Sequence, residues 1–154
     1  MNTHPYLRAY MAGITVPSAF LLVILTVFVV ARHVYLIPIP IEKMIVFPMA
    51  VLPNAFGAWN MLYARLSRHR YLPIGVHGAI LPFLLAPLAL ATFSSLGFVR
   101  ITSQGFVWFE AVPGIGPVLI PYTFFATVFL VPLIIYYLIW KYLVGFLNEV
   151  LGIA

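Results

Sequence analysis

The chain contains few side chains that could carry out chemistry. It has no cysteine and no aspartate, and its acidic residues are Glu42, Glu110 and Glu149. General acid–base catalysis needs a positioned carboxylate, histidine or lysine, and hydrolytic metal sites need clusters of His, Asp, Glu or Cys. No such cluster, nucleophile motif or phosphate loop is present. We therefore expect a protein that is not an enzyme and has no metal site.

His77 is the histidine that the sequence places within an apolar stretch, in the segment GVHGAI. A neutral imidazole can bind the iron of haem or the magnesium of a chlorophyll-type pigment, and Gly78 would let a flat macrocycle approach the backbone. His4, His33 and His69 lie in tails or loops, so a second haem ligand is lacking. His77 is thus a candidate axial ligand for a singly ligated pigment or haem. Otherwise the sequence predicts no cofactor.

The segment VLPNAFGAWN, residues 51–60, places polar residues and a proline in an otherwise apolar stretch. Pro53 lacks an N–H group and leaves the carbonyl of Met49 without its helical partner, so the helix should loosen there. Small and polar residues recur at helical spacing along one face: Ala50, Asn54, Gly57, Ala58 and Met61. Such a face lets two helices pack closely while an asparagine amide forms a hydrogen bond across the contact. We expect Pro53, Asn54 and Gly57 to serve structural packing.

Asn60 and His77 lie at comparable distances from the middle of the loop ARLSRHR, seven residues before Ser67 and ten residues after it. In an antiparallel pair of helices, residues equidistant from the turn lie at similar depth. The two side chains should therefore be neighbours, and an amide-to-imidazole hydrogen bond is the structural alternative to a ligand role for His77.

Composition identifies the elements that hold these residues. The chain is 64% hydrophobic and 7% charged, which no soluble fold could cover with polar surface. Four long intervals lack charges, and each can cross a hydrocarbon core, which takes about 20 helical residues. We expect an all-α membrane protein with transmembrane helices at about 12–34, 44–63, 73–97 and 118–143. The continuous apolar character excludes a barrel, and one domain should span 1–154.

The basic residues predict orientation. With the N-terminus inside, five cations are cytoplasmic (Arg8, Arg65, Arg68, Arg70 and Lys141) and three are outside (Arg32, Lys43 and Arg100). The positive-inside rule then favours cytoplasmic N- and C-termini in a multi-pass protein of a cell membrane, of the bacterial inner-membrane type. Arg65, Arg68 and Arg70 should also contact anionic lipids or a partner. Because the cations flank helices instead of forming one face, nucleic acid is not an expected partner.

The longest connection, residues 98–117, reads FVRITSQGFVWFEAVPGIGP. Its Ser-Gln-Gly centre lies between two β-favouring apolar stretches, which suits a short extracytoplasmic hairpin, and an interfacial helix is the alternative. The segment is either a surface loop anchored by Trp108 and Phe109 or a cap over a binding site.

These features favour an accessory or structural subunit that packs against larger partners in a membrane complex of the respiratory or photosynthetic type. The membrane-embedded part contains no carboxylate, which argues against coupled transport. Two alternatives remain: a small oligomeric channel or uncoupled transporter that uses the proline-interrupted helices, and a single-histidine pigment- or haem-binding protein.

Overall fold

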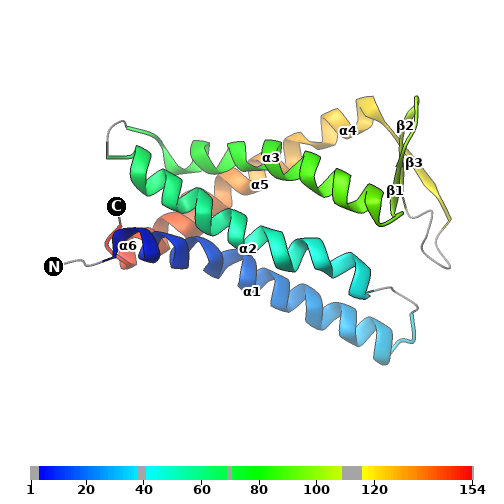
Figure 1. Cartoon of the computed structure of the whole chain (residues 1–154), viewed down its shortest axis with the longest axis horizontal. Helices are drawn as coiled ribbons and strands as arrows, with labels where there is room; N and C mark the ends of the chain where they lie inside the picture. Colours follow the sequence, from blue (N-terminus) through cyan, green and yellow to red (C-terminus); the bar gives the residue numbers. More distant parts are fainter. Residues whose placement is uncertain (1–3, 38–40, 69–70, 109–115, 154) are drawn as a thin grey trace.

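The computed structural model describes residues 4–37, 41–68, 71–108 and 116–153. Its helices and strands follow one another as α1 (Pro5–His33), α2 (Ile41–Leu66), α3 (Ile74–Ser95), β1 (Val99–Ile101), β2 (Gly105–Trp108), β3 (Val118–Pro121), α4 (Tyr122–Val128), α5 (Leu130–Leu138), η1 (Ile139–Val144) and α6 (Gly145–Val150). The last four elements follow one another directly and form one long rod (Figure 1). The molecule therefore consists of four long helical stretches and a small sheet.

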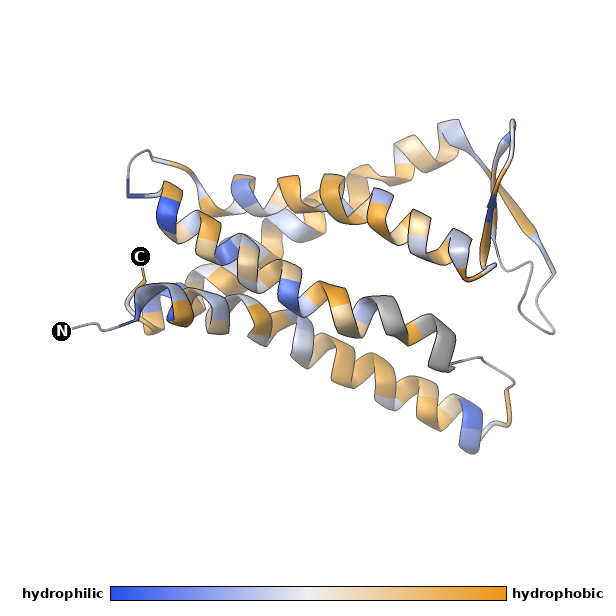
Figure 2. Cartoon of the chain, viewed as in Figure 1, coloured by the Kyte–Doolittle hydropathy of each residue, from blue (hydrophilic) through white to orange (hydrophobic). Residues whose placement is uncertain are grey.

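Within the described residues, three of these stretches are long and apolar enough to cross a membrane: Pro5–His33, Ile74–Ser95 and Tyr122–Val150. Their 29, 22 and 29 residues exceed the roughly 20 that a hydrocarbon core requires. Apolar residues cover most of their length (Figure 2). The prediction of a mostly helical protein with apolar helices long enough to cross a membrane is confirmed for these three stretches.

α1 and α2 pack against each other through two glycines. A Cβ atom on Gly13 would lie 2.5 Å from the backbone oxygen of Phe56, and one on Gly57 would lie 2.6 Å from the ring of Tyr10. Only a hydrogen in place of each side chain allows the two backbones to approach so closely. The two helices therefore form an antiparallel pair.

The second pair consists of α3 and the rod, and the two pairs meet in a core near the chain termini. This core contains Phe56, Leu81, Leu85, Trp140 and Val144, all buried. Figure 1 shows both termini at this end of the molecule and the sheet at the opposite end. The helices are thus joined most firmly where the chain begins and ends.

The rod departs from regular α-helix twice. Phe129 separates α4 from α5 as a turn, three residues before Pro132, whose missing N–H removes one helical hydrogen bond. η1 is a π-helical turn, in which the N–H of Gly145 donates to the carbonyl of Trp140. Such wide turns are rare and usually single. Both irregularities lie within the stretch that the sequence predicts as one helix.

The boundaries of the predicted fourth helix were wrong at both ends. Residues 118–121 form β3, and the helical rod begins at Tyr122 and continues to Val150 instead of ending at 143. Residues 118–121 are extended because they pair with β2 from Gly105–Pro121 to Trp108–Val118. The helix can begin only after Pro121, whose backbone is extended.

The hairpin expected within residues 98–117 is present. β1 and β2 pair antiparallel, with Val99 opposite Trp108 and Ile101 opposite Phe106. Gly105, the first residue of β2, has a φ of +155°, and a Cβ there would lie 2.2 Å from the backbone oxygen of Ile120, so a side chain does not fit. Phe109 and Glu110 lie outside the described residues. β3 makes the sheet three-stranded, which the sequence analysis did not foresee.

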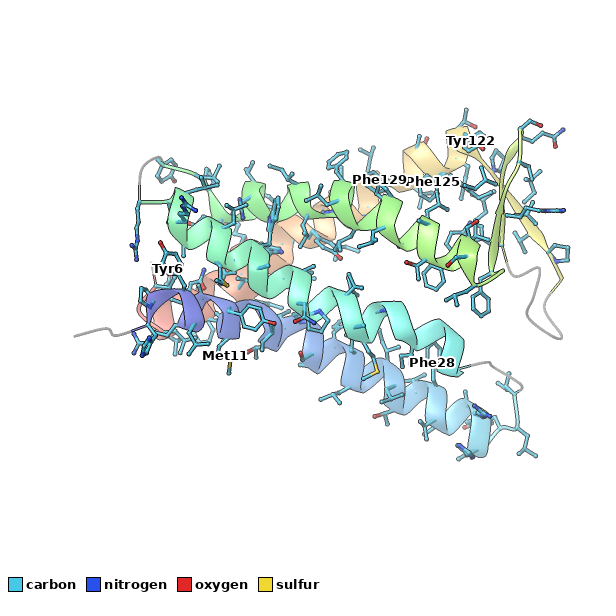
Figure 3. All side chains as sticks on the ribbon, viewed as in Figure 1. Tyr6, Met11, Phe28, Tyr122, Phe125 and Phe129 are labelled. Atoms are coloured by element: carbon cyan, nitrogen blue, oxygen red, sulfur yellow. The ribbon has the colours of Figure 1, made fainter. Side chains whose placement is uncertain are left out.

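The sheet is attached to the helices by aromatic contacts. The ring of Phe106 lies 4.9 Å from that of Phe125 and 5.0 Å from that of Tyr122, measured between centroids. Figure 3 shows Tyr122 and Phe125 near the sheet. Phe98 and Val99 are buried beside Phe106. A second, smaller core therefore fixes the sheet to α3 and α4.

Candidate functional site

The most polar part of the interior lies at the end of the bundle that holds the termini. Asn60 of α2 and Asn148 of α6 are both fully buried. The Asn60 Nδ2 atom donates to Asn148 Oδ1 at 2.7 Å and to the backbone oxygen of Ala9 in α1 at 2.8 Å. Asn148 Nδ2 donates in return to Asn60 Oδ1 at 3.0 Å. This reciprocal amide pair, which we name the Asn60–Asn148 pair, joins three helices.

The predicted hydrogen bond between Asn60 and His77 was wrong. The two residues do lie near the same end of the bundle, as the loop position indicated. Consecutive residues on a helix point about 100° apart, however, since 3.6 residues complete a turn. α2 therefore directs Trp59 toward α3 and His77, and directs Asn60 toward α1 and α6.

His77 forms a reciprocal pair with Trp59. The Trp59 Nε1 atom donates to the backbone oxygen of His77 at 2.9 Å, and His77 Nε2 lies 3.0 Å from the backbone oxygen of Trp59. A carbonyl oxygen only accepts hydrogen bonds, so Nε2 is the protonated nitrogen. The two rings are stacked with centroids 4.8 Å apart. The imidazole is therefore held in one orientation and one tautomer.

Three aromatic rings contact the imidazole of His77. Besides Trp59 on one face, the rings of Tyr63 and Trp140 lie 5.4 Å and 5.7 Å from the imidazole centroid. A Cβ on Gly78 would lie only 1.9 Å from Cγ of Trp140. The gap beside Gly78, which the sequence suggested for a pigment, is thus filled by an indole ring. His77 Nε2 and the space beside Gly78 are thus both engaged in contacts within the chain.

The polar face of α2 lies against α1. The Tyr10 hydroxyl donates to Oδ1 of Asn54, and Asn54 Nδ2 donates to the backbone oxygen of Ala50 at 2.8 Å. Gly57 faces the side chains of Tyr10 and Ile14. Pro53 lies within α2 and is partly buried. The sequence analysis did not identify Tyr10 as the partner of Asn54. Tyr10 lies on α1, the helix that packs against this face of α2.

The basic cluster extends from the end of α2 into the following loop. Arg65 and Arg68 are exposed, and the Arg68 guanidinium carbon lies 5.5 Å from the ring centroid of Tyr6. Arg8 donates from Nη1 to the backbone oxygen of Leu151 at 3.0 Å. Arg70 lies outside the described residues. The beginning of α1 and the end of α2 thus place cations together at the molecular surface.

The site as a whole is organised for packing. Among the described residues, no group of three or more His, Cys, Asp or Glu side chains could hold a metal ion. The three buried polar side chains, Asn60, His77 and Asn148, all have partners within the chain. Together with the apolar spans, these contacts define a helical protein whose spans are long enough to cross a membrane.

Comparison with known proteins gives no further assignment. No family model matches the chain, and no curated protein or solved structure matches it.

Proposed function

We propose that this chain is a four-span integral membrane protein that serves as an accessory or structural subunit and packs against larger membrane partners. In this proposal the fourth span is α2. Its 26 residues give a length of about 39 Å at 1.5 Å per residue, and it lies against the full-length span α1. Both termini lie at one end of the molecule (Figure 1), as an even number of crossings requires.

The charges support an orientation with both termini in the cytoplasm of a cell membrane. The end that holds the termini contains Arg8, Arg65 and Arg68. The opposite end contains Arg32, in the last turn of α1, and Arg100, in β1. Cytoplasmic loops carry the excess of lysine and arginine. The sheet would then lie on the outer surface.

The observation that carries the proposed role is that the buried amide and imidazole side chains bond to one another and to the backbone, whereas the indole N–H of the buried Trp140 has no hydrogen-bond partner among the described residues. Asn60 forms hydrogen bonds with Asn148 and with the backbone of Ala9. His77 forms its hydrogen bond with the backbone of Trp59. Phe56, Leu81, Leu85, Trp140 and Val144 fill the space between the two helix pairs. An interior of this kind supports a stably packed helix bundle. We therefore expect the outer surface of the bundle to contact the partner.

The rod offers the barest outer surface. Of its 18 most apolar residues, only 6% are buried inside the molecule, compared with 11% for α1 and 33% for α3. Ile134 and Leu138 are 60% and 44% exposed and, four residues apart, lie on one face. We propose this face as the contact with the larger partner.

Affinity purification of the tagged full-length chain in a mild detergent tests the role. We expect larger membrane subunits to co-purify, and the double variant Ile134→Ala, Leu138→Ala to lose them. The matched control, Val23→Ala with Val27→Ala, changes two residues of α1 that have the same spacing and are 65% and 59% exposed, and should retain them. Equal loss in both variants, or no co-purifying subunit, would contradict the proposal.

The same preparation distinguishes the two alternative functions. Solute flux in liposomes that contain only this protein would favour a channel or uncoupled transporter. Visible absorption that disappears in His77→Ala would favour a pigment- or haem-binding protein, against the packing around His77 described above.

A further inference from the structure

We propose that the groove between the beginning of α1 and the end of α2 binds an anionic phospholipid, with the lipid phosphate at Arg65 and Arg68 and an acyl chain along Met61 and Leu62. The inference requires that this end of the bundle lie at the membrane surface. It does not require that the protein be an accessory subunit.

The groove is a shallow cavity of about 400 Å³ lined by Tyr6, Met61, Leu62 and Arg65. That volume lies within the range of roughly 300 to 1,000 Å³ typical of small-molecule sites. Figure 3 places Tyr6 at the start of α1, beside the end of α2. Two helices therefore build its walls, and its mouth faces outward. We name it the Arg65 groove.

The order of residues along α2 gives the groove one apolar part and one cationic part. Met61 and Leu62 precede Arg65 by four and three residues, and residues with these spacings lie on the same helix face. The apolar pair is nearer the middle of α2, and Arg65 is in its last turn. A phospholipid has the same order, with acyl chains in the bilayer and the phosphate at its surface.

The guanidinium groups supply the chemistry for a phosphate. Arginine presents several N–H donors in a planar fork that matches phosphate oxygens in a bidentate way. Tyr6 holds the second guanidinium close to the groove, because the Arg68 carbon lies 5.5 Å from its ring centroid, within the range of a cation–π contact. Within the described part of the chain, no carboxylate is paired with Arg65 or Arg68.

The groove favours a lipid over an acidic protein segment. An acidic peptide would use the guanidinium groups but would leave Met61 and Leu62 without an apolar partner. A diacyl lipid covers these side chains and neutralises the cations together. Basic residues next to a helix end are also the usual binding sites for anionic headgroups.

Native mass spectrometry of the purified full-length chain, titrated with phosphatidylglycerol, tests the proposal. Removing one cation near a membrane surface should weaken binding roughly fivefold, and removing two roughly 30-fold. We therefore expect about fivefold weaker binding for Arg65→Gln and about 30-fold for Arg65→Gln with Arg68→Gln. Lys141→Gln is the matched control, since Lys141 is an exposed cation of the rod and its loss should leave the affinity nearly unchanged.

A second variant keeps both arginines. Tyr6→Ala removes the ring that holds Arg68 beside the groove and should weaken binding about two- to fivefold, the equivalent of an exposed cation–π contact of about 0.5 to 1 kcal/mol. If the double glutamine variant does not fold, Tyr6→Ala still tests whether the groove binds the lipid.

Other ligands distinguish the possible sources of the phosphate. Phosphatidylcholine should bind more weakly than phosphatidylglycerol, and inorganic phosphate at equal concentration should not displace the lipid. Displacement by inorganic phosphate, or by hexaglutamate as readily as by phosphatidylglycerol, would overturn the proposal. Equal weakening by Arg65→Gln and Lys141→Gln would overturn it as well.

Discussion

The Asn60–Asn148 pair should produce strongly coupled losses of stability when its members are replaced by leucine. Asn148→Leu removes the two hydrogen bonds between the side chains and leaves the bond from Asn60 to Ala9 intact. Asn60→Leu removes all three bonds. Hydrogen bonds between membrane helices average about 0.6 kcal/mol and reach about 1.7, and a buried polar group left without a partner costs about 1–3 kcal/mol.

These magnitudes predict the free energies of unfolding. Asn148→Leu should lower the free energy of unfolding by about 1–2 kcal/mol and Asn60→Leu by about 2–3 kcal/mol. The double variant should lose about as much as Asn60→Leu alone, because both bonds broken by Asn148→Leu are already absent. The coupling energy should therefore be about 1–2 kcal/mol, which is within the range observed for contacting residues.

Reversible unfolding in mixed micelles, followed by circular dichroism while the denaturing detergent is increased, measures these quantities. A control cycle combines Asn148→Leu with Ser95→Ala. The Ser95 hydroxyl donates to the backbone oxygen of Thr92 at the end of α3 near the sheet, so the two losses of stability should be additive. If the losses of Asn60→Leu and Asn148→Leu added to within about 0.5 kcal/mol, the two amides would not form the pair described here.

Three glycines provide further predictions in the same unfolding assay. Gly13→Ala should lower the free energy of unfolding by about 2 kcal/mol or more and Gly57→Ala by about 1 kcal/mol, because overpacking costs about 1–3 kcal/mol. The Cβ of the first variant would meet a backbone oxygen, which cannot move alone, whereas that of the second would meet the Tyr10 ring, which can rotate. The reverse order of losses would contradict the close contact of α1 and α2. Gly78→Ala should cause the largest loss of stability, since its Cβ would lie 1.9 Å from Trp140. Adding Trp140→Leu should restore part of that stability. No recovery would mean that the indole ring is not the obstacle.

The long helices could be predicted from the sequence because long uncharged apolar intervals have one stable solution in a membrane. Their ends could not. Residues 118–121 are as apolar as the helix that follows, and they are extended only because β2 offers them backbone partners. That pairing joins residues separated by the undescribed segment 109–115, so local pattern carried no signal for it.

The partners of the polar residues were only partly predictable. The distance from the loop correctly placed Asn60 and His77 near the same end, but depth does not determine the direction in which a side chain points. Asn148 was missed because the predicted helix ended at 143, although the sequence YLVGFLN, residues 142–148, has no charge. A longer helix would have revealed a second asparagine near the end of the bundle that holds the termini.

The wide turn η1 explains how Asn148 reaches Asn60. Trp140, Val144 and Asn148 are buried and follow one another at intervals of four residues. On a regular helix of 3.6 residues per turn, four residues exceed a full turn by about 40°, so Asn148 would point about 80° away from Trp140. A π-helical turn completes its circle with more residues, and at 139–144 it reduces this drift so that all three side chains face the core. Because π-helical turns are rare on their own, the packing of Trp140 on Gly78 and the Asn60–Asn148 pair must hold η1 in place, just as η1 holds them in register. We therefore expect the end of the bundle near the termini to unfold as one cooperative unit, and such rigidity suits the proposed role of a subunit that binds partners through its outer surface.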